Sequence, residues 1–143
     1  MRTPTRRGGN RWTPILFTLL ILVGAMSAQA AVLINEVDAD QVSTDSAEFV
    51  ELYGSAFESL DGLVLVLYNG SDNASYLAFD LDGYSCNADG FFVLCGDAAN
   101  VANCDLDVSP ETNLIQNVAD AVALYTGNDT DFPNDTPVTA TNL

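Results

Sequence analysis

Short apolar runs separated by polar turns make up most of this chain after residue 31. The first two runs, 32–37 and 49–53, are rich in β-branched and aromatic residues. They flank a loop of Asp, Ser and Thr. Each run has the length of a strand, and neither repeats at helical spacing. We therefore expect two strands joined by an acidic loop.

Further apolar runs follow the same pattern, and Asp-Gly or Asn-Gly steps lie between several of them. Such steps are turn signals. Short strands at roughly ten-residue spacing are typical of a β-sandwich or barrel. The run 91–94 is apolar throughout, so we expect that strand to be buried on both faces. No stretch after Ala31 has the period of an amphipathic helix. The sequence thus predicts an all-β domain with strands near 32–37, 49–53, 63–68, 76–81, 91–95 and 121–125, and a further short strand near 137–140.

The N-terminal segment 1–30 has a different pattern from the rest of the chain. All four basic residues precede Trp12, an apolar block follows at 15–26, and Ala28 and Ala30 supply small residues. This arrangement is typical of a secretory signal peptide. The apolar block is also shorter than the roughly 20 residues of a membrane-spanning helix. We expect a signal-peptide helix, cleavage after Ala30, and a mature domain at 31–143 that is extracellular or at the cell surface, without a membrane span.

Cleavage changes the charge of the protein more than its length. None of the four basic residues would remain, whereas all 20 acidic residues would, and the chain has no His. The mature domain therefore has a formal charge of −20, compared with −16 for the precursor. No side-chain salt bridge can form in it, and only the new α-amino group can carry a positive charge. Because phosphate binding needs Lys or Arg, we expect no direct binding to nucleic acid.

The residue inventory also argues against catalysis. Without His or Lys, the mature domain has neither a nucleophile–histidine relay nor a lysine Schiff base. Asn35, Glu36, Glu48 and Glu51 are polar residues in or beside the first two apolar runs. Buried polar groups that satisfy backbone partners explain them better than a catalytic carboxylate pair does. We expect no catalytic residues.

Calcium is the only cofactor for which the sequence supplies candidate ligands. Asp-x-Asp steps recur beside predicted turns, and hard cations are bound by carboxylate and carbonyl oxygens. None of these steps matches the EF-hand loop. A solvated acidic surface is the usual explanation for Asp in loops. If calcium binds, the best candidate ligands are Asp38 and Asp40 with Asp45.

Three cysteines would enter an oxidising compartment, which predicts one disulfide and one odd thiol. Cys95 and Cys104 flank the segment 96–103, so we favour that pair slightly over one that uses Cys86. We expect the aromatic residues to serve core or cross-strand packing rather than a ligand platform. They are Tyr53, Tyr68, Phe79, Phe91 and Tyr125.

Three motifs, taken in order, resemble the lamin-tail domain family: Leu-Ile-Asn-Glu-Val at 33–37, Glu-Phe-Val-Glu-Leu-Tyr at 48–53 and Leu-Asp-Gly-Leu-Val-Leu at 60–65. The segments 90–94 and 117–125 are also similar to strands of that family. The resemblance implies an immunoglobulin-like β-sandwich in a secreted bacterial protein. Such domains accompany extracellular nucleases of the endonuclease/exonuclease/phosphatase type. Gly54 stands where the family usually has Asn, and the family's last strand has no counterpart, so we expect a C-terminally incomplete sandwich.

These observations favour a non-catalytic exported module that binds or anchors a larger protein. The alternative is an N-terminal accessory fragment of a secreted metal-dependent endonuclease/exonuclease whose catalytic domain lies outside this sequence. A third hypothesis, adhesion or carbohydrate binding, requires an exposed aromatic strip. The residues leave the binding partner and the oligomeric state open, and we expect a fused or neighbouring domain in the full-length protein.

Overall fold

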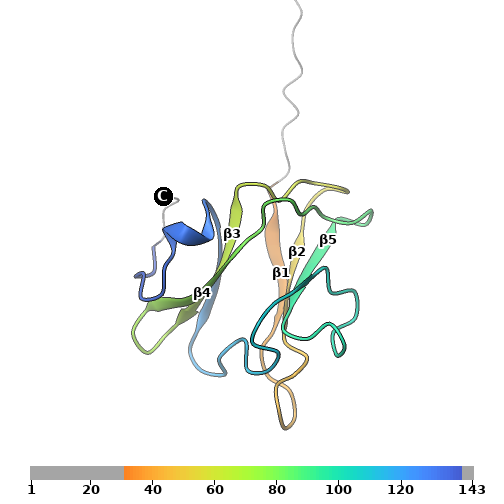
Figure 1. Cartoon of the computed structure of the whole chain (residues 1–143). Coiled ribbons are helices and arrows are strands. Elements are labelled where there is room, and N and C mark those ends of the chain that lie inside the picture. Colours follow the sequence, from red (N-terminus) through yellow and green to blue (C-terminus); the bar gives the residue numbers. More distant parts are fainter. Residues whose placement is uncertain (1–30, 140–143) are drawn as a thin grey trace, which may run out of the picture.

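Two packed β-sheets form the domain in the computed structural model, which describes residues 31–139 (Figure 1). The first sheet has the strand order β1-β2-β5-β6, and the second has the order β4-β3-β7. Neighbouring strands are antiparallel except β5 and β6, which are parallel. The strands are β1 (Leu33–Asp38), β2 (Phe49–Tyr53), β3 (Leu63–Asn69), β4 (Ala74–Asp80), β5 (Phe91–Cys95), β6 (Leu106–Asp107) and β7 (Ala121–Thr126), followed by a 3₁₀ turn η1 (Asp129–Asp131).

The prediction of an all-β sandwich is confirmed at this level, and all six main strands occur where the apolar runs lie. β4 begins two residues before the predicted start, and β6 was not predicted. Near the expected short strand at 137–140, Pro137 makes a single bridge with Ala74. The predicted signal peptide at 1–30 lies outside the described residues. Within the described part, no helix is long and apolar enough to cross a membrane.

Side-chain alternation along the strands builds the main core between the sheets. From β2, Val50 and Leu52 point inward, and they are joined in one buried cluster by Phe92 from β5 and by Leu65 and Leu67 from β3. Because side chains alternate along a strand, the odd-numbered residues of β2 point to the outer face of the first sheet. β5 is buried along most of its length, as the apolar run predicted.

The outer face of the second sheet has a second core. Val64, Val66 and Tyr68 of β3 form a buried cluster there with Tyr125 and Phe132. The rings of Tyr125 and Phe132 stack with centroids 4.8 Å apart. The segment around η1 thus covers this face (Figure 1). Among residues 31–139, no buried cluster like this one covers the outer face of β1 and β2, and the candidate site lies on that face.

Candidate functional site

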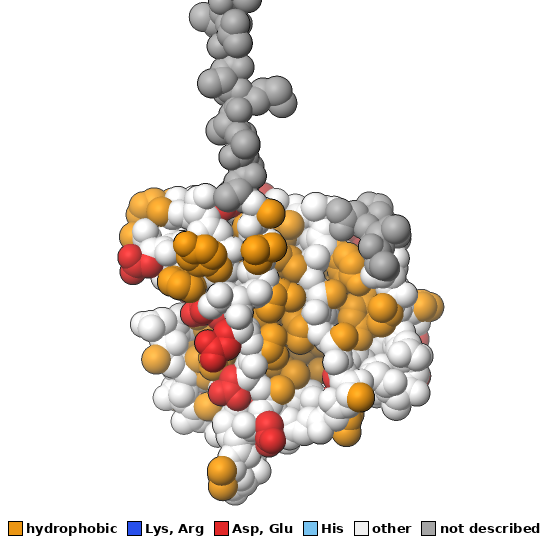
Figure 2. Space-filling model, turned by 180° about the vertical axis from the view of Figure 1, so that it is seen from behind, with side chains coloured by type: hydrophobic (Ala, Val, Ile, Leu, Met, Phe, Trp, Pro, Cys, Tyr) orange, Lys and Arg blue, Asp and Glu red, His pale blue; other side chains and the backbone are white. Residues whose placement is uncertain are grey.

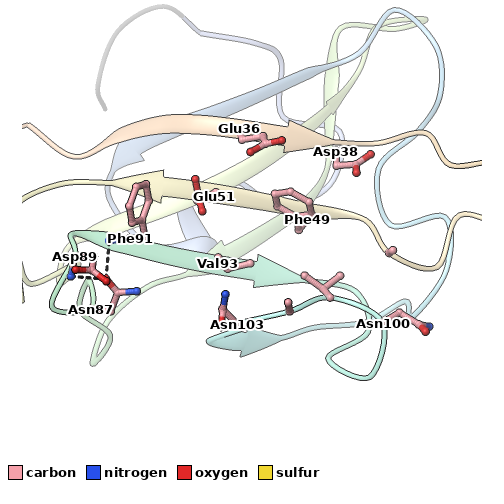
Figure 3. A pocket seen from close by; sticks show the side chains of 13 residues that line it. Glu36, Asp38, Phe49, Glu51, Asn87, Asp89, Phe91, Val93, Asn100 and Asn103 are labelled. Atoms are coloured by element: carbon pink, nitrogen blue, oxygen red, sulfur yellow. Dashed lines mark hydrogen bonds between the residues drawn. The ribbon is translucent and has the colours of Figure 1, made fainter.

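A groove of about 430 Å³ lies on the outer face of β1, β2 and β5 (Figure 3). We call it the outer groove. Strand alternation places Phe49 and Glu51 of β2 in it, next to Phe91 and Val93 of β5. The segment 100–103 forms the opposite wall. The groove thus combines an apolar floor with polar walls, as most ligand sites in proteins do.

A disulfide holds this wall in place. Cys95, at the end of β5, is joined to Cys104 with the two Cα atoms 5.8 Å apart, which confirms the favoured pairing. Val101 is 8 % exposed and packs in a small cluster with Val93 and Cys95. This small cluster, beside Phe49, gives the loop between β5 and β6 a fixed position along the groove.

An aromatic pair extends the apolar floor toward the end of the sheet. Tyr53 and Phe91 are direct cross-strand partners, and their ring centroids are 5.0 Å apart. Tyr53 remains 47 % exposed, whereas Tyr68 and Tyr125 are buried in the second core. The expected cross-strand packing is therefore present, and it leaves one aromatic ring accessible beside the groove.

Carboxylates and amides line the walls. Four acidic side chains border the groove, and Asn87, Asn100 and Asn103 lie among them. Asn87 accepts hydrogen bonds through Oδ1 from the N–H groups of Asp89 and Phe91, at 2.9 and 3.0 Å, which fixes the turn before β5 (Figure 3). The acidic residues are Glu36, Asp38, Glu51 and Asp89.

The electrostatic character of the groove follows from the composition. Residues 31–139 contain no Lys, Arg or His, so no basic side chain offsets the four carboxylates. On the face shown in Figure 2, acidic side chains gather in a column beside an apolar strip. A groove of this kind repels phosphate, sulfate and other anions and attracts cationic groups.

The predicted calcium ligands have different environments. Asp38 lines the outer groove and accepts a hydrogen bond from Gln41 Nε2 at 2.9 Å. Asp45 is 4 % exposed and accepts from the Gln41 N–H at 2.8 Å and from the side-chain amide of Asn117. Asp40 is exposed. Within residues 31–139, no group of three or more Asp, Glu, Cys or His side chains could hold a metal ion. Gln41 and Asn117 organise this loop, and calcium binding there stays a prediction.

Glu48 shows what the polar residues near the strands do. It is 1 % exposed, and its carboxylate accepts hydrogen bonds from the N–H groups of Leu114 and Ile115 at 2.5 and 3.0 Å. Burial raises the pKa of this carboxyl. Glu48 thus satisfies backbone groups, as expected, whereas Asn35 donates to the Glu51 side chain at 2.7 Å.

Sequence reasoning missed Asn87 and Asp89 in the groove and the buried carboxylate of Glu58. Asn87 precedes Asp89-Gly90, a turn signal that fixes a loop without saying which face the loop borders. Glu58 is 7 % exposed although its surrounding segment is polar, so no periodicity marks it.

The outer groove is lined by carboxylates, amides and aromatic rings, and its lining includes no serine, cysteine or histidine. Comparison with protein-family models, with curated proteins and with solved structures finds no match for the chain. The geometry of this groove is therefore the basis for assigning a function.

Proposed function

We propose that this chain is an exported, non-catalytic β-sandwich module that binds its ligand in the outer groove. One observation carries the proposal: the outer face of one sheet is covered, and the outer face of the other is open. The second sheet covers its outer face with a buried aromatic cluster, whereas the first sheet keeps an aromatic and acidic groove open. An exposed concave surface with an apolar floor and convergent polar groups is the usual form of a binding site.

The groove chemistry restricts the class of ligand. Its four carboxylates and lack of basic side chains exclude anionic ligands, because each would lose hydration without gaining a counter-charge. The amides and carboxylates can accept hydrogen bonds from hydroxyl or ammonium groups. The aromatic residues supply apolar contact area, and Tyr53 is 47 % exposed. The ligand is therefore a hydrogen-bond donor that is uncharged or cationic, such as a neutral polysaccharide segment.

A groove variant tests this function. Phe91→Ala removes one of the two aromatic rings of the groove floor, and we expect it to weaken binding of a neutral oligosaccharide or an oligolysine peptide at least tenfold in calorimetry. Phe57→Ala is the matched control, because that ring is 71 % exposed and lies outside the groove. Equal affinity of both variants and the wild type for every ligand that binds would exclude the groove as the site. Sulfated polysaccharides should bind to none of the three proteins.

The resemblance to the lamin-tail domain supports an immunoglobulin-like assignment within this proposal. The motif at 33–37 forms most of β1, the motif at 48–53 contains β2, and the motif at 60–65 leads into β3. The segment 117–125 contains most of β7. Each motif thus coincides with a strand or with the turn that begins one. In this interpretation the module accompanies another domain of the same exported protein.

The same resemblance favours a second candidate, an accessory fragment of a secreted nuclease. It shares with the first a non-catalytic role for residues 31–143, since the nuclease chemistry would belong to another domain. We expect these residues to neither cleave nor retain DNA in the presence of Mg²⁺ or Ca²⁺, because they contain no basic side chain. Cleavage by the purified domain would contradict both candidates.

A further inference from the structure

Glu58 ends a tight turn and buries a carboxylate that is only half satisfied. The side chain is 7 % exposed, and Oε2 accepts a hydrogen bond from the N–H of Ser55 at 2.6 Å. Oε1 is buried and has no hydrogen-bond partner among the described residues. Burying a carboxylate oxygen without a partner is strongly unfavourable. A donor or a cation beside Oε1 would remove this penalty.

The first described residues of the chain lie beside this carboxylate. Ala31, Val32 and Glu58 line the same cavity, of about 470 Å³. Glu58 Oε2 and Val32 Cγ2 both lie within 3.2 Å of the point that a Cβ on Gly54 would occupy. Gly54 therefore leaves the space in which the start of the chain and the carboxylate meet.

Strand register leads to the same placement. Leu33 pairs with Tyr53 at the start of the antiparallel β1–β2 ladder. Continued by two residues, this register sets Ala31 opposite Ser55, whose N–H binds the Glu58 carboxylate. The backbone nitrogen of Ala31 thus begins the strand extension that runs past Glu58.

The charge inventory leaves one cation for this carboxylate. After residue 30 the chain has no Lys, Arg or His, so no side chain of the domain can neutralise Glu58. In the precursor the nitrogen of Ala31 belongs to an uncharged peptide bond. We propose that removal of the signal peptide creates an α-ammonium group at Ala31 that pairs with the Glu58 carboxylate, so that processing completes the fold. This inference rests on the cleavage after Ala30 that belongs to the proposed function.

The other groups around Glu58 do not compete as cations. Asp61 and Tyr125 line the same cavity, and the N–H of Cys86 donates to the Glu58 carbonyl at 2.9 Å. A hydrogen bond from the Gly83 N–H holds the pKa of Asp61 below its usual value, so this carboxylate is charged at neutral pH and adds to the attraction for an ammonium. The thiol of Cys86 and the phenol of Tyr125 are uncharged when protonated.

The test uses residues 31–143 produced with a free Ala31 amine. The main core cluster, including the residues packed against it, lies within 32–124, so this chain contains the core that it needs. We expect NMR titration to place the pKa of the Ala31 amine at least one unit above its ordinary value of about 7.7–8.0, a tenfold gain in proton affinity. In Glu58→Gln the pKa of the amine should fall back most of the way toward the ordinary value, and only the smaller contribution of Asp61 should remain. Glu111→Gln, an exposed residue with the same change of charge, should retain the raised pKa.

The dependence of thermal stability on pH supplies a second measurement, which does not require the Glu58→Gln variant. A raised amine pKa stabilises the fold below the unfolded-state pKa, and this contribution is lost as pH rises through the folded-state pKa. The native chain should therefore lose more thermal stability between pH 7 and pH 10 than a chain extended by Gly-Ser before Ala31. Both chains retain Cys86 and every tyrosine, so their alkaline titrations cancel in the comparison.

The possible results test the Ala31–Glu58 ion pair and the cleavage after Ala30 separately. An amine pKa that is the same in the native chain and in Glu58→Gln, or equal alkaline losses in the native and extended chains, overturns the pairing. N-terminal sequencing of the exported protein addresses the cleavage itself. A terminus other than Ala31 overturns the processing step and leaves the binding function of the outer groove to its own test.

Discussion

At the scale of single residues, buried carboxylates in this domain are held by backbone and amide N–H groups. The described chain offers them no basic side chain. Glu48 accepts from two backbone N–H groups, and Asp45 accepts from a backbone N–H and an amide. Such bonds favour the charged form, whereas burial disfavours it. For Glu48 burial is the larger effect, so the pKa is raised and the contact between this residue, just before β2, and the segment 114–115 depends on pH.

Replacing Glu48 by Gln tests this dependence. Because the folded-state pKa lies above the ordinary value of 4.5, the contribution of Glu48 to stability is fully present below that value and is lost as pH rises through the folded-state pKa. Gln does not titrate and leaves one buried N–H without an acceptor, at a cost of about 1–3 kcal/mol. Glu48→Gln should have a lower free energy of unfolding than the wild type. We expect this difference, measured by urea unfolding, to become smaller from pH 4 to pH 8.

The exposed Glu111→Gln variant is again the control, since it makes the same chemical change without a buried partner. Its stability should follow the wild type at every pH. A deficit of Glu48→Gln that is constant or grows with pH would contradict the raised pKa.

At the scale of elements, the loop between β5 and β6 depends on its disulfide. Cys95 and Cys104 are nine residues apart in sequence, and closing a loop of that length contributes about 2–3 kcal/mol in the chain-entropy model. We expect the double variant Cys95→Ala/Cys104→Ala to lose that much unfolding free energy. Ligand affinity should fall as well, because the segment 100–103 forms a wall of the outer groove.

A reducing agent provides the control for this prediction. It should lower the urea midpoint of the wild type to that of the double variant and leave the variant unchanged. Cys86 is buried and free, so its thiol takes no part in the exchange. Retention of full stability after complete reduction would show that the loop is held by the packing of Val101 alone.

The sequence was informative about elements whose pattern is local. Apolar runs located the six main strands, and the continuous run at 91–94 correctly indicated a strand buried along most of its length. β6 has only two residues, Leu106–Asp107, which is too short for alternation to mark it. The outer groove was missed because its walls come from β1, β2 and two loops, and only the sheet order brings them together.

The surroundings of a residue in the fold, rather than its type, explain the other differences between the sequence predictions and the structure. Burial of Glu48 was expected from its place beside an apolar run, whereas Asp45 and Glu58 lie outside the apolar runs and are nevertheless less than 8 % exposed. Glu48 and Asp45 accept hydrogen bonds from the distant segment 114–117, which the sequence does not place beside them, whereas Glu58 is held by the N–H of Ser55 within its own turn. The sequence predicted that the aromatic residues serve core or cross-strand packing, but it could not tell that Tyr53 faces solvent while Tyr68 faces a second core.

At the scale of the whole molecule, the second sheet contributes an additional core, and the first sheet carries the proposed binding surface. The second sheet buries side chains on both faces of β3, so it adds a core without offering a binding surface. The first sheet is buried on its inner face and carries the groove on the other. This division lets variants of the outer groove change affinity without removing the main core.

The net charge gives a prediction that belongs to the molecule as a whole. With a formal charge of −20 after cleavage and no internal ion pairs, the compact state repels itself at low salt. Raising NaCl from 0.01 M to 0.15 M shortens the screening length from about 30 Å to about 8 Å, comparable with the spacing of neighbouring charges. We expect the melting temperature of residues 31–143 to rise over this range.

Calcium separates screening from site binding in the same experiment. At equal ionic strength, CaCl₂ and NaCl raise the melting temperature equally if screening alone acts. An additional rise with CaCl₂ that disappears in Asp38→Asn/Asp40→Asn would assign it to the acidic loop between β1 and β2, because a bound ion stabilises only the state that binds it. A melting temperature that responds to neither salt would contradict the self-repulsion from which both expectations start.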